Sequence, residues 1–281
     1  MDFDKFVAAG NDFIIFDGIK NPYKDYNELA LKVCNRHFGI GADGIMLCEN
    51  SLIADIKMLY YNSDGTQGEM CGNGIRSFSK YIYDYDIVKK QNISIETLDG
   101  IKHITIDTDE LDKVNKVKVD MGYPSFESNK IPVKLHKEKI IEETIYIDCK
   151  EYKYSAVLVG VPHVVIFVED IKEIDINDLG KKIENHPLFP RKTNVNFIEV
   201  IDNHNINIYT WERGAGRTLG CGTGSCASVV IGNVTKKLNN IVHINTEGGT
   251  LSVEIGEDGK IYMTGDATHI ARGELLILKE D

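Results

Sequence analysis

Short runs of β-branched and aromatic residues recur along the whole chain and predict a protein made mostly of β-strands. Asp99-Gly100 and Asp258-Gly259 each separate two such runs. Because an Asp-Gly pair adopts the tight turn of a hairpin, neighbouring strands are expected to be antiparallel. The runs cover residues 13–17, 44–48, 54–61, 93–98, 116–121, 154–160, 164–170, 194–200, 206–211, 251–255 and 260–265.

Apolar residues at helical spacing occur in fewer places than the strand pattern. They predict helices at residues 25–37, 75–83, 176–185 and 225–234. Two of these helices begin directly after a Cys-Gly-x-Gly turn, in MCGNGIRS at 70–77 and in GCGTGSCA at 220–227. Each half of the chain therefore contains one Cys-Gly-x-Gly turn followed by a predicted helix.

The similarity of the two turns extends upstream of the cysteines. When Cys71 is aligned with Cys221, KMLYYN at 57–62 falls on NIYTWE at 207–212. Each half then reads strand, glycine-containing loop, Cys-Gly-x-Gly and helix, which indicates an internal duplication. Two domains related by pseudo-twofold symmetry are expected to bring the thiols face to face across a cleft. The junction is placed near 120–124, where a strand ends in MGYP.

Length and charge narrow the class of protein. The 281 residues suffice for two domains, and the formal net charge is −11, from 43 acidic and 32 basic residues. An acidic chain without a basic stripe is not expected to bind nucleic acid. The N-terminal MDFDKFVAAGNDF does not resemble a signal peptide, and no run approaches the roughly 20 apolar residues that span a bilayer. We therefore expect a soluble, cytoplasmic protein without a membrane partner.

The six cysteines include no C-x-x-C pair, and the chain is too long for a disulfide scaffold, so free thiols are predicted. Cys34, Cys48 and Cys149 lie in apolar helix or strand patterns and are predicted to be buried and inert, and Cys226 is expected to pack along the helix after Cys221. The histidines form no H-x-x-x-H or Cys/His cluster, so no metal site is expected.

A cysteine at a helix start suggests acid–base chemistry on a carboxylic acid. The first N–H groups of a helix and the positive end of its dipole bind a carboxylate, and the same field lowers a cysteine pKa below about 8.5. A thiolate and a thiol on opposite faces of the bound acid form a general base and a general acid. Moving a Cα proton from one face to the other is racemisation or epimerisation, and Cys71 and Cys221 are the candidate pair.

Two other functions compete with this hypothesis. FGIGADG contains G-x-G-x-x-G at Gly39, Gly41 and Gly44, but it follows a predicted helix and opens a strand, whereas a dinucleotide fingerprint follows a strand and opens a helix. No nucleotide and no other cofactor is therefore expected. A protein that only binds an amino acid, as a sensor or carrier, is the non-enzyme alternative, but binding alone has no need for two opposed thiols.

Seven segments carry a resemblance to a known family: GNDF (10–13), RHFGIGADG (36–44), YNSDGTQGEMCGNGIR (61–76), the Pro-His of GVPH (160–163), TNVNF (193–197), ERGAGRTLGCGTGSCA (212–227) and MTGDATH (263–269). In these segments the chain resembles diaminopimelate epimerase, a cofactor-independent two-base amino-acid racemase family. The resemblance spans nearly the whole chain and implies an α+β fold of two pseudo-symmetric domains, each a curved, mostly antiparallel sheet around a central helix. It places the N-terminal half at 1–120 plus 268–281 and the C-terminal half at 121–267, and it implies a homodimer.

The resemblance also implies roles for individual residues. Cys71 and Cys221 would be the acid/base pair, with His163 and Glu212 close to the reacting amine and the thiols. Backbone N–H groups would hold the reacting carboxylate, and an arginine fork with three asparagines would hold the distal amino-acid head. The residues that would hold the reacting carboxylate are Gly72, Asn73, Gly222 and Thr223. The residues that would hold the distal head are Asn11, Asn62, Asn194 and Arg213.

The chain departs from the family pattern at Val161, where the family usually has an asparagine that helps grip the distal group. Valine donates no hydrogen bond, so a racemase of another amino acid, such as lanthionine, histidine or glutamate, is the alternative with the same mechanism. Arg217 is a second departure, since the family more often has an acidic or neutral residue there. The sequence offers no physical account of it.

Overall fold

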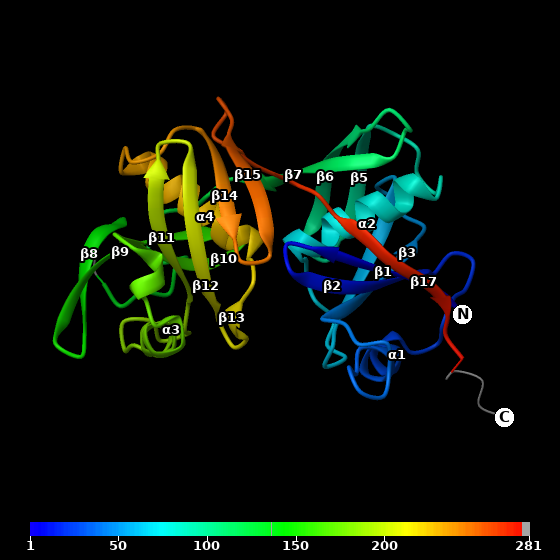
Figure 1. The fold of residues 1–281 in the computed structure, drawn as a ribbon, viewed down its shortest axis with the longest axis horizontal. Helices are drawn as coiled ribbons and strands as arrows, with labels where there is room; N and C mark the ends of the chain where they lie inside the picture. The colour runs from blue at the N-terminus through cyan, green and yellow to red at the C-terminus, as the bar shows by residue number, and fades with distance from the viewer. Residues whose placement is uncertain (136, 277–281) are drawn as a thin grey trace. The chain divides into compact units, whose positions relative to one another are not determined.

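The computed structural model describes residues 1–135 and 137–276 (Figure 1). The chain divides into two compact units: unit 1 is Met1–Val119 together with the segment from Gly265 onward, and unit 2 is Asp120–Thr264. The domain limits expected from the sequence stay a prediction, and their last residues, 277–281, lie outside the described residues. Among the described residues, no helix has the length and apolar character needed to cross a bilayer.

Unit 1 is a sheet whose strands pair in the order β17-β1-β2-β3-β4-β5-β6-β7. Its elements are β1 (Asp2–Ala8), β2 (Asn11–Asp17), α1 (Tyr26–Val33), β3 (Gly44–Glu49), β4 (Ile56–Asn62), α2 (Gly72–Asp84), β5 (Asn92–Thr97), β6 (Gly100–Thr108), β7 (Val114–Gly122) and β17 (Thr268–Glu274). The pairs β2–β3 and β4–β5 are parallel and the rest antiparallel. Helix α1 joins the first parallel pair and α2 the second.

Unit 2 repeats this arrangement, with its strands in the order β8-β9-β10-β11-β12-β14-β15-β16. Its elements are β8 (Ile140–Ile147), β9 (Lys150–Val159), β10 (Val161–Val168), the 3-10 turn η1 (Ile171–Glu173), α3 (Ile176–Glu184), β11 (Asn194–Asp202), β12 (Asn205–Glu212), β13 (Gly216–Thr218), α4 (Gly222–Val234), β14 (Ile241–Thr246), β15 (Gly249–Ile255) and β16 (Ile261–Gly265). The parallel pairs are β10–β11 and β12–β14, joined by α3 and α4.

The pairing register confirms the internal duplication. In unit 1 Phe13 pairs with Gly44, and in unit 2 His163 pairs with Asn194, so both partners are offset by 150 positions (163 − 13 and 194 − 44). Helices α2 and α4 begin at residues 72 and 222, which is the same offset. Residues 150 apart over these elements therefore occupy equivalent places in the two units.

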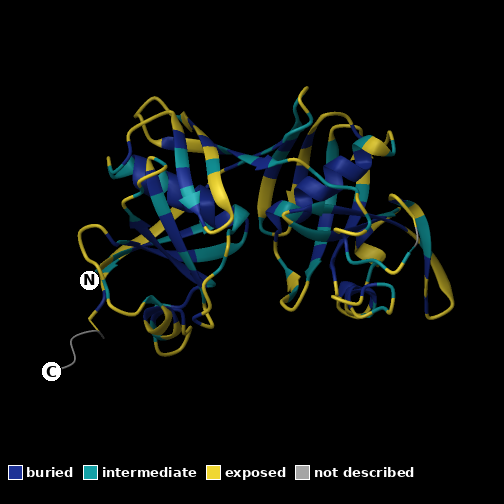
Figure 2. Ribbon diagram, turned by 180° about the vertical axis from the view of Figure 1, so that it is seen from behind, coloured by how far each residue is buried: buried dark blue, intermediate teal, exposed yellow. Residues whose placement is uncertain are grey.

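The central helix of each unit is almost completely buried, as the dark blue of α2 and α4 in Figure 2 shows. Strand β3 explains why the core is layered: Ile45 and Leu47 pack with Leu29 of α1, whereas Met46 points to the other side, against the first turn of α2. Both faces of the strand are covered, so it reads as a continuous apolar run and not as an alternating one.

The structure corrects several predicted elements. The helices expected to begin at residues 75 and 225 begin three residues earlier, at Gly72 and Gly222, because each cysteine caps its helix directly. The helix expected to reach residue 37 ends at Val33, because the Asn35 side chain accepts the N–H groups of His37 and Phe38 and competes with helical bonding.

Every predicted strand is present, so the strand predictions fail only by omission. Strands β1, β6, β8, β13, β14 and β17 were not predicted, and β17 is exposed along nearly its whole length. Both predicted hairpins are present, with Gly100 and Gly259 at φ +83° and +82°, the left-handed region that glycine reaches without strain.

Candidate functional site

The two cysteines are the N-cap residues of the central helices. Cys71 has an extended backbone (φ −129°, ψ 116°), and its Sγ accepts the N–H of Gly74 at 3.4 Å. Cys221 has nearly the same backbone (φ −118°, ψ 116°), and its Sγ accepts the N–H of Gly224 at 3.4 Å. Each thiol thus lies at the positive end of a helix dipole, as the sequence predicted.

The third residue of each helix is a glycine that packs closely against a side chain of the neighbouring strand. A Cβ on Gly74 would come within 1.9 Å of Met46 Cε, and one on Gly224 within 2.3 Å of Asn196 Oδ1. The first helical turn therefore lies directly on the neighbouring strand in both units. This close approach fixes the position of each cysteine relative to the sheet.

The electrostatic environment of Cys221 opposes the helix dipole. Burial raises the pKa of the Cys221 thiol well above its usual value, and the Glu212 carboxylate raises it further by its charge and by a hydrogen bond. Hydrogen bonds from Thr223, with Oγ1 3.3 Å from Sγ, and from Gly224 act in the other direction but are weaker. The expectation of a lowered pKa is wrong for Cys221, because desolvation and a like charge outweigh the helix terminus.

His163 lies on β10 and is completely buried. Burial lowers its pKa to about 3, and the charge of Arg213 acts in the same direction, so the ring is neutral. Its Nδ1 lies 3.2 Å from the amide nitrogen of Asn196. Its Nε2 is buried and has no hydrogen-bond partner among the described residues.

Two of the predicted substrate-binding residues of unit 1 are hydrogen-bonded to each other. The Asn73 amide donates to Asn11 Oδ1 at 2.7 Å, and the Asn11 amide donates to Asp43 Oδ2 at 2.9 Å. Arg36 holds Asp43 at 2.8 Å and Asp12 by two hydrogen bonds of 2.7 and 3.1 Å. These three residues lie in the family segments GNDF and RHFGIGADG, but the sequence did not predict that Asp12, Arg36 and Asp43 form the network that orients Asn11.

The predicted residues Asn194 and Arg213 of unit 2 are joined in a similar way. Asn194 Oδ1 accepts the backbone N–H of Arg213 at 2.9 Å, and its amide donates to the Pro162 carbonyl at 2.8 Å. The Arg213 side chain is exposed, and among the described residues its guanidinium donates only to the Arg191 carbonyl, at 3.5 Å. Its fork of donors is therefore available to a ligand.

A buried carboxylate that the sequence did not point to supports the same loop. Glu184, at the end of α3, is only 4% exposed and accepts hydrogen bonds from Trp211 Nε1 at 2.8 Å and from the Gly214 N–H at 3.0 Å. Lys192 lies 3.4 Å from the same carboxylate. Trp211 and Gly214 flank Glu212 and Arg213 on either side, so Glu184 holds the segment that carries them.

The remaining predicted residues lie in or beside these loops. Asn62, at the end of β4, accepts the Tyr60 hydroxyl at 2.7 Å and donates to Thr66 Oγ1 at 3.0 Å. Gly72 and Gly222 are the first residues of α2 and α4. The first N–H groups of a helix have no partner within the helix, so these positions can donate to an anion.

The structure shows where the two residues that depart from the family pattern, Val161 and Arg217, lie and what Arg217 contacts. Val161 is half-buried at the start of β10 and occupies the place that Asn11 has in unit 1, given the offset of 150. Arg217 forms a two-pronged ion pair with Glu247, with nitrogen–oxygen distances of 3.1 and 2.5 Å, and lies over the Tyr209 ring. Arg217 therefore fastens β13 to the β14–β15 turn.

The other cysteines follow the prediction with one exception. Cys34, Cys48 and Cys226 are buried, and burial raises the pKa of Cys34 and Cys48 to about 12, which makes them poor nucleophiles. Cys149 is exposed, contrary to the prediction, because it lies in the β8–β9 turn with φ +63° and not inside a strand. No group of acidic, histidine and cysteine side chains in the described residues has the make-up of a metal site.

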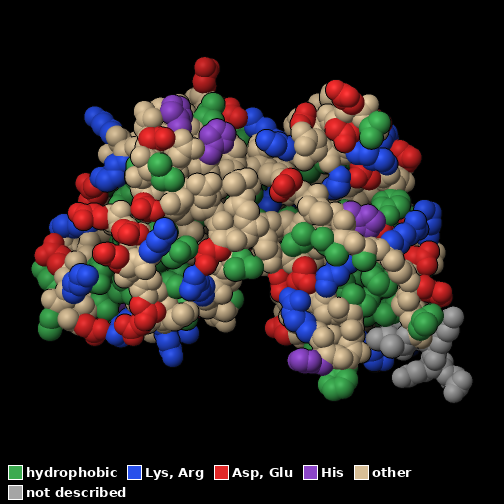
Figure 3. All heavy atoms as spheres, in the orientation of Figure 1, with side chains coloured by type: hydrophobic (Ala, Val, Ile, Leu, Met, Phe, Trp, Pro, Cys, Tyr) green, Lys and Arg blue, Asp and Glu red, His purple; other side chains and the backbone are tan. Residues whose placement is uncertain are grey.

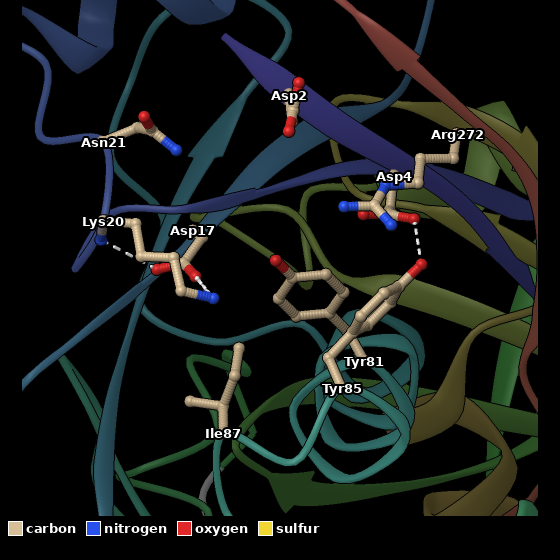
Figure 4. A pocket seen from close by; sticks show the side chains of 9 residues that line it. All are labelled: Asp2, Asp4, Asp17, Lys20, Asn21, Tyr81, Tyr85, Ile87 and Arg272. Carbon is tan, nitrogen blue, oxygen red and sulfur yellow. Dashed lines mark hydrogen bonds and ion pairs between the residues drawn. The ribbon is translucent and has the colours of Figure 1, made fainter.

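A small cavity of about 70 Å³ lies in unit 1 away from the predicted site residues (Figure 4). The Tyr85 hydroxyl donates to Asp4 Oδ1 at 2.6 Å, and Lys20 pairs with Asp17 at 3.1 Å. Two of the three carboxylates that line this cavity, Asp4 and Asp17, thus already have a hydrogen-bond or ion-pair partner. On the surface in Figure 3, acidic and basic side chains are likewise intermixed.

Solved structures of low sequence identity define the class of fold. A hydroxyproline epimerase from Agrobacterium vitis superposes with a TM-score of 0.67 at 15% identity, covering 97% of this chain and 91% of that one. A phenazine biosynthesis protein of the PhzF family from Bacillus anthracis gives 0.68 at 16% identity, covering 98% and 99%. The chain thus has the two-unit fold shared by these proteins, and the predicted fold class is confirmed.

Sequence relatives identify the family within that fold. The family model for diaminopimelate epimerase matches residues 3–127 and 155–270. A diaminopimelate epimerase from Caldanaerobacter subterraneus is 48% identical over 277 residues, covering 99% of this chain and 100% of the relative, and one from Methanococcus maripaludis is 43% identical over 276 residues, covering 98% and 99%. The chain belongs to the diaminopimelate epimerase family and is an isomerase, as the resemblance implied.

Proposed function

We propose that this chain interconverts LL-2,6-diaminopimelate and meso-diaminopimelate by proton transfer through Cys71 and Cys221, without a cofactor. The observation that carries the proposal is the matched pair of N-cap cysteines, each heading a buried helix of 13 residues. The relatives named above carry this substrate in their names. The reaction serves lysine and peptidoglycan synthesis, and we propose that it takes place in the cytoplasm, in a homodimer.

The reaction removes a proton from Cα and adds a proton to the opposite face, without oxidation or reduction. One thiolate takes the Cα proton, the electron pair of the broken C–H bond moves into the carboxylate to form an enediolate, and the other thiol protonates the opposite face. Burial and Glu212 favour the protonated form of Cys221. We therefore assign Cys221 as the proton donor in the resting enzyme and Cys71 as the base, with the roles exchanged in the reverse direction.

The helix starts would stabilise the negative charge that develops on the carboxylate. Gly72 and Asn73 in unit 1, and Gly222 and Thr223 in unit 2, are the first two residues of their helices. Preorganised N–H donors aimed at an oxyanion typically contribute about 10²–10³ in rate each. Because the enediolate carries more charge on oxygen than the ground state does, these donors act mainly in the transition state.

The distal head group would be held by side chains whose orientation is already fixed. Asn11 and Asn194 are locked by hydrogen bonds to Asp43 and to the Pro162 carbonyl, which reduces the entropy cost of binding. Arg213 offers two parallel donors to a carboxylate. The fixed position of Asn62 between Tyr60 and Thr66 supports the same role.

The test uses proton NMR to measure how fast the Cα proton signal of LL-diaminopimelate disappears in D₂O in the presence of the reduced enzyme. We expect rapid exchange in the wild type and a rate reduced by about 10²–10⁴ in Cys71→Ala and in Cys221→Ala, because each loses an acid or base. Cys149→Ala is the matched control, since that thiol is exposed in a turn, and it should keep the wild-type rate. Full activity of either of the first two variants would refute the two-thiol mechanism.

Val161 favours a second candidate within the same chemistry, a racemase of an amino acid without the distal head. A half-buried apolar side chain at this place suits a substrate with an apolar or shorter end. The same NMR experiment with L-histidine and L-glutamate, which lack a second amino-acid head, separates the two. Exchange that is faster with histidine or glutamate than with diaminopimelate would favour this candidate.

A further inference from the structure

The amide of Asn196 has only one possible orientation. Asn196 lies on β11 and is completely buried. One of its amide atoms lies 3.1 Å from the Val164 carbonyl oxygen, and the other lies 3.3 Å from Thr210 Oγ1. Because a carbonyl oxygen can only accept, the atom next to Val164 must be the nitrogen Nδ2, and the atom next to Thr210 must be Oδ1.

This orientation determines the tautomer of His163. Nδ2 carries two hydrogens: one is donated to the Val164 carbonyl, and the other points to His163 Nδ1 at 3.2 Å. A ring nitrogen that faces an N–H donor must offer its lone pair. Since a neutral imidazole carries a single N–H, the hydrogen of His163 lies on Nε2.

The Nε2–H group is then a buried donor that the protein does not use. No described residue accepts from it, and the atom is shielded from solvent. Leaving a buried donor unsatisfied is unfavourable, so such a group in a native protein is expected to have an acceptor in the ligand-bound state. On a zwitterionic amino acid the ammonium only donates, and the carboxylates are the groups that accept.

Unit 1 shows that the fold does not require this polar cluster. At the offset of 150, Phe13 stands for His163 and Met46 for Asn196, and both are buried. The same sheet and helix start therefore form around an apolar pair. The polar pair was placed in unit 2 at a cost in desolvation that packing alone does not explain.

We propose that Asn196 is a positioning residue that holds His163 as the neutral Nε2–H tautomer, so that His163 donates a hydrogen bond to a substrate carboxylate and does not act as a base. The proposal rests on the proposed function for the identity of the substrate, but the tautomer itself is a property of the free enzyme. Asn196 acts only through His163.

The first experiment measures the ring nitrogens of His163 by two-bond ¹H–¹⁵N correlation NMR on the ¹⁵N-labelled, full-length, ligand-free enzyme. The signal is assigned by its loss in His163→Asn. We expect a protonated Nε2 and an unprotonated Nδ1 near neutral pH. A protonated Nδ1 in the wild type would overturn the proposal, whatever the outcome of the cysteine tests.

The variants reverse or remove the restraint. Asn196→Asp places an acceptor beside Nδ1, so the hydrogen should move from Nε2 to Nδ1. Asn196→Met introduces the residue found at the equivalent place in unit 1, so it should fold and leave the ring free to exchange tautomers. Asn92→Asp adds the same charge at an exposed strand start in unit 1 and is the matched control. Unchanged ring nitrogens in both Asn196 variants would overturn the proposal.

The substrate half of the proposal has its own readout. Saturating the Cys71→Ala enzyme with LL-diaminopimelate should shift Nε2 and its hydrogen. The kcat of Asn196→Asp should fall about 10²-fold, as for loss of one oxyanion donor, because the hydrogen of His163 has moved away from Nε2. An Nε2 signal that does not move on saturation would refute the bond to the carboxylate. Ring nitrogens as expected with no exchange in any substrate would instead point to failure of the proposed function.

Discussion

Acidification should destabilise this protein through His163 in particular. The unfolded-state pKa of the ring is near 6.5, and burial lowers the folded-state pKa to about 3, with the charge of Arg213 adding to the effect. Between these values the unfolded state binds a proton that the folded state does not. Folding stability therefore rises with pH across this window and is lost as pH falls from about 6.5 towards 3.

The size of the effect follows from the width of the window. From about pH 6.5 to about pH 4 the two states differ by one proton over 2.5 pH units, and at 1.36 kcal/mol per unit this amounts to about 3 kcal/mol. For a domain pair of ordinary stability this is a large fraction of the total.

Urea denaturation at a series of pH values tests the effect, with His163→Asn as the reference. Asparagine cannot titrate, and its oxygen can still accept from the Asn196 amide. Other titrating groups contribute alike to both proteins, so the difference between their unfolding free energies isolates His163. We expect the wild type to lose about 3 kcal/mol more than the variant between about pH 6.5 and pH 4. Parallel curves would refute the assignment of a buried, neutral ring.

The remaining predictions concern the loop of unit 2 and the two departures from the family. Glu184→Gln should destabilise by about 1–3 kcal/mol, because a charged acceptor of two hydrogen bonds is weakened; the fluorescence of Trp211, the single tryptophan, should change with it. Val161→Asn should lower KM for diaminopimelate without raising kcat, as measured by steady-state kinetics. Arg217→Lys should leave kcat and KM unchanged and cost less than about 1 kcal/mol in urea denaturation, because its ion pair is partly exposed.

Both hairpins and the internal duplication were predicted from the residues because they depend on short motifs, whereas the fold class followed from the family resemblance. A Cys-Gly-x-Gly turn before a helix pattern is readable within ten residues, and so is an Asp-Gly turn. Strand β17 was missed because it has little apolar pattern and is held by pairing with β1, a partner far away in the chain. Pairing of that kind leaves no mark on the local sequence.

The candidate site divides in the same manner. Cys71 and Cys221 were found from their duplicated surroundings, but Glu184 and Asn196 were not, because each acts through contacts with residues on other elements. The pKa direction of Cys221 was predicted wrongly for a related reason. The helix terminus is visible in the sequence, whereas the burial of the thiol and the approach of Glu212 are tertiary facts.

The constant offset of 150 positions makes each unit an internal reference for the other. A residue of unit 2 on these elements has a counterpart in unit 1 that occupies the equivalent place, in some cases with a different kind of side chain. Met46 is the counterpart of Asn196, and Phe13 is the counterpart of His163. Replacing a residue by its counterpart from the other unit therefore introduces a side chain that already fits an equivalent place in the same fold. Differences in activity among such exchanges would report on chemistry, with packing largely held constant.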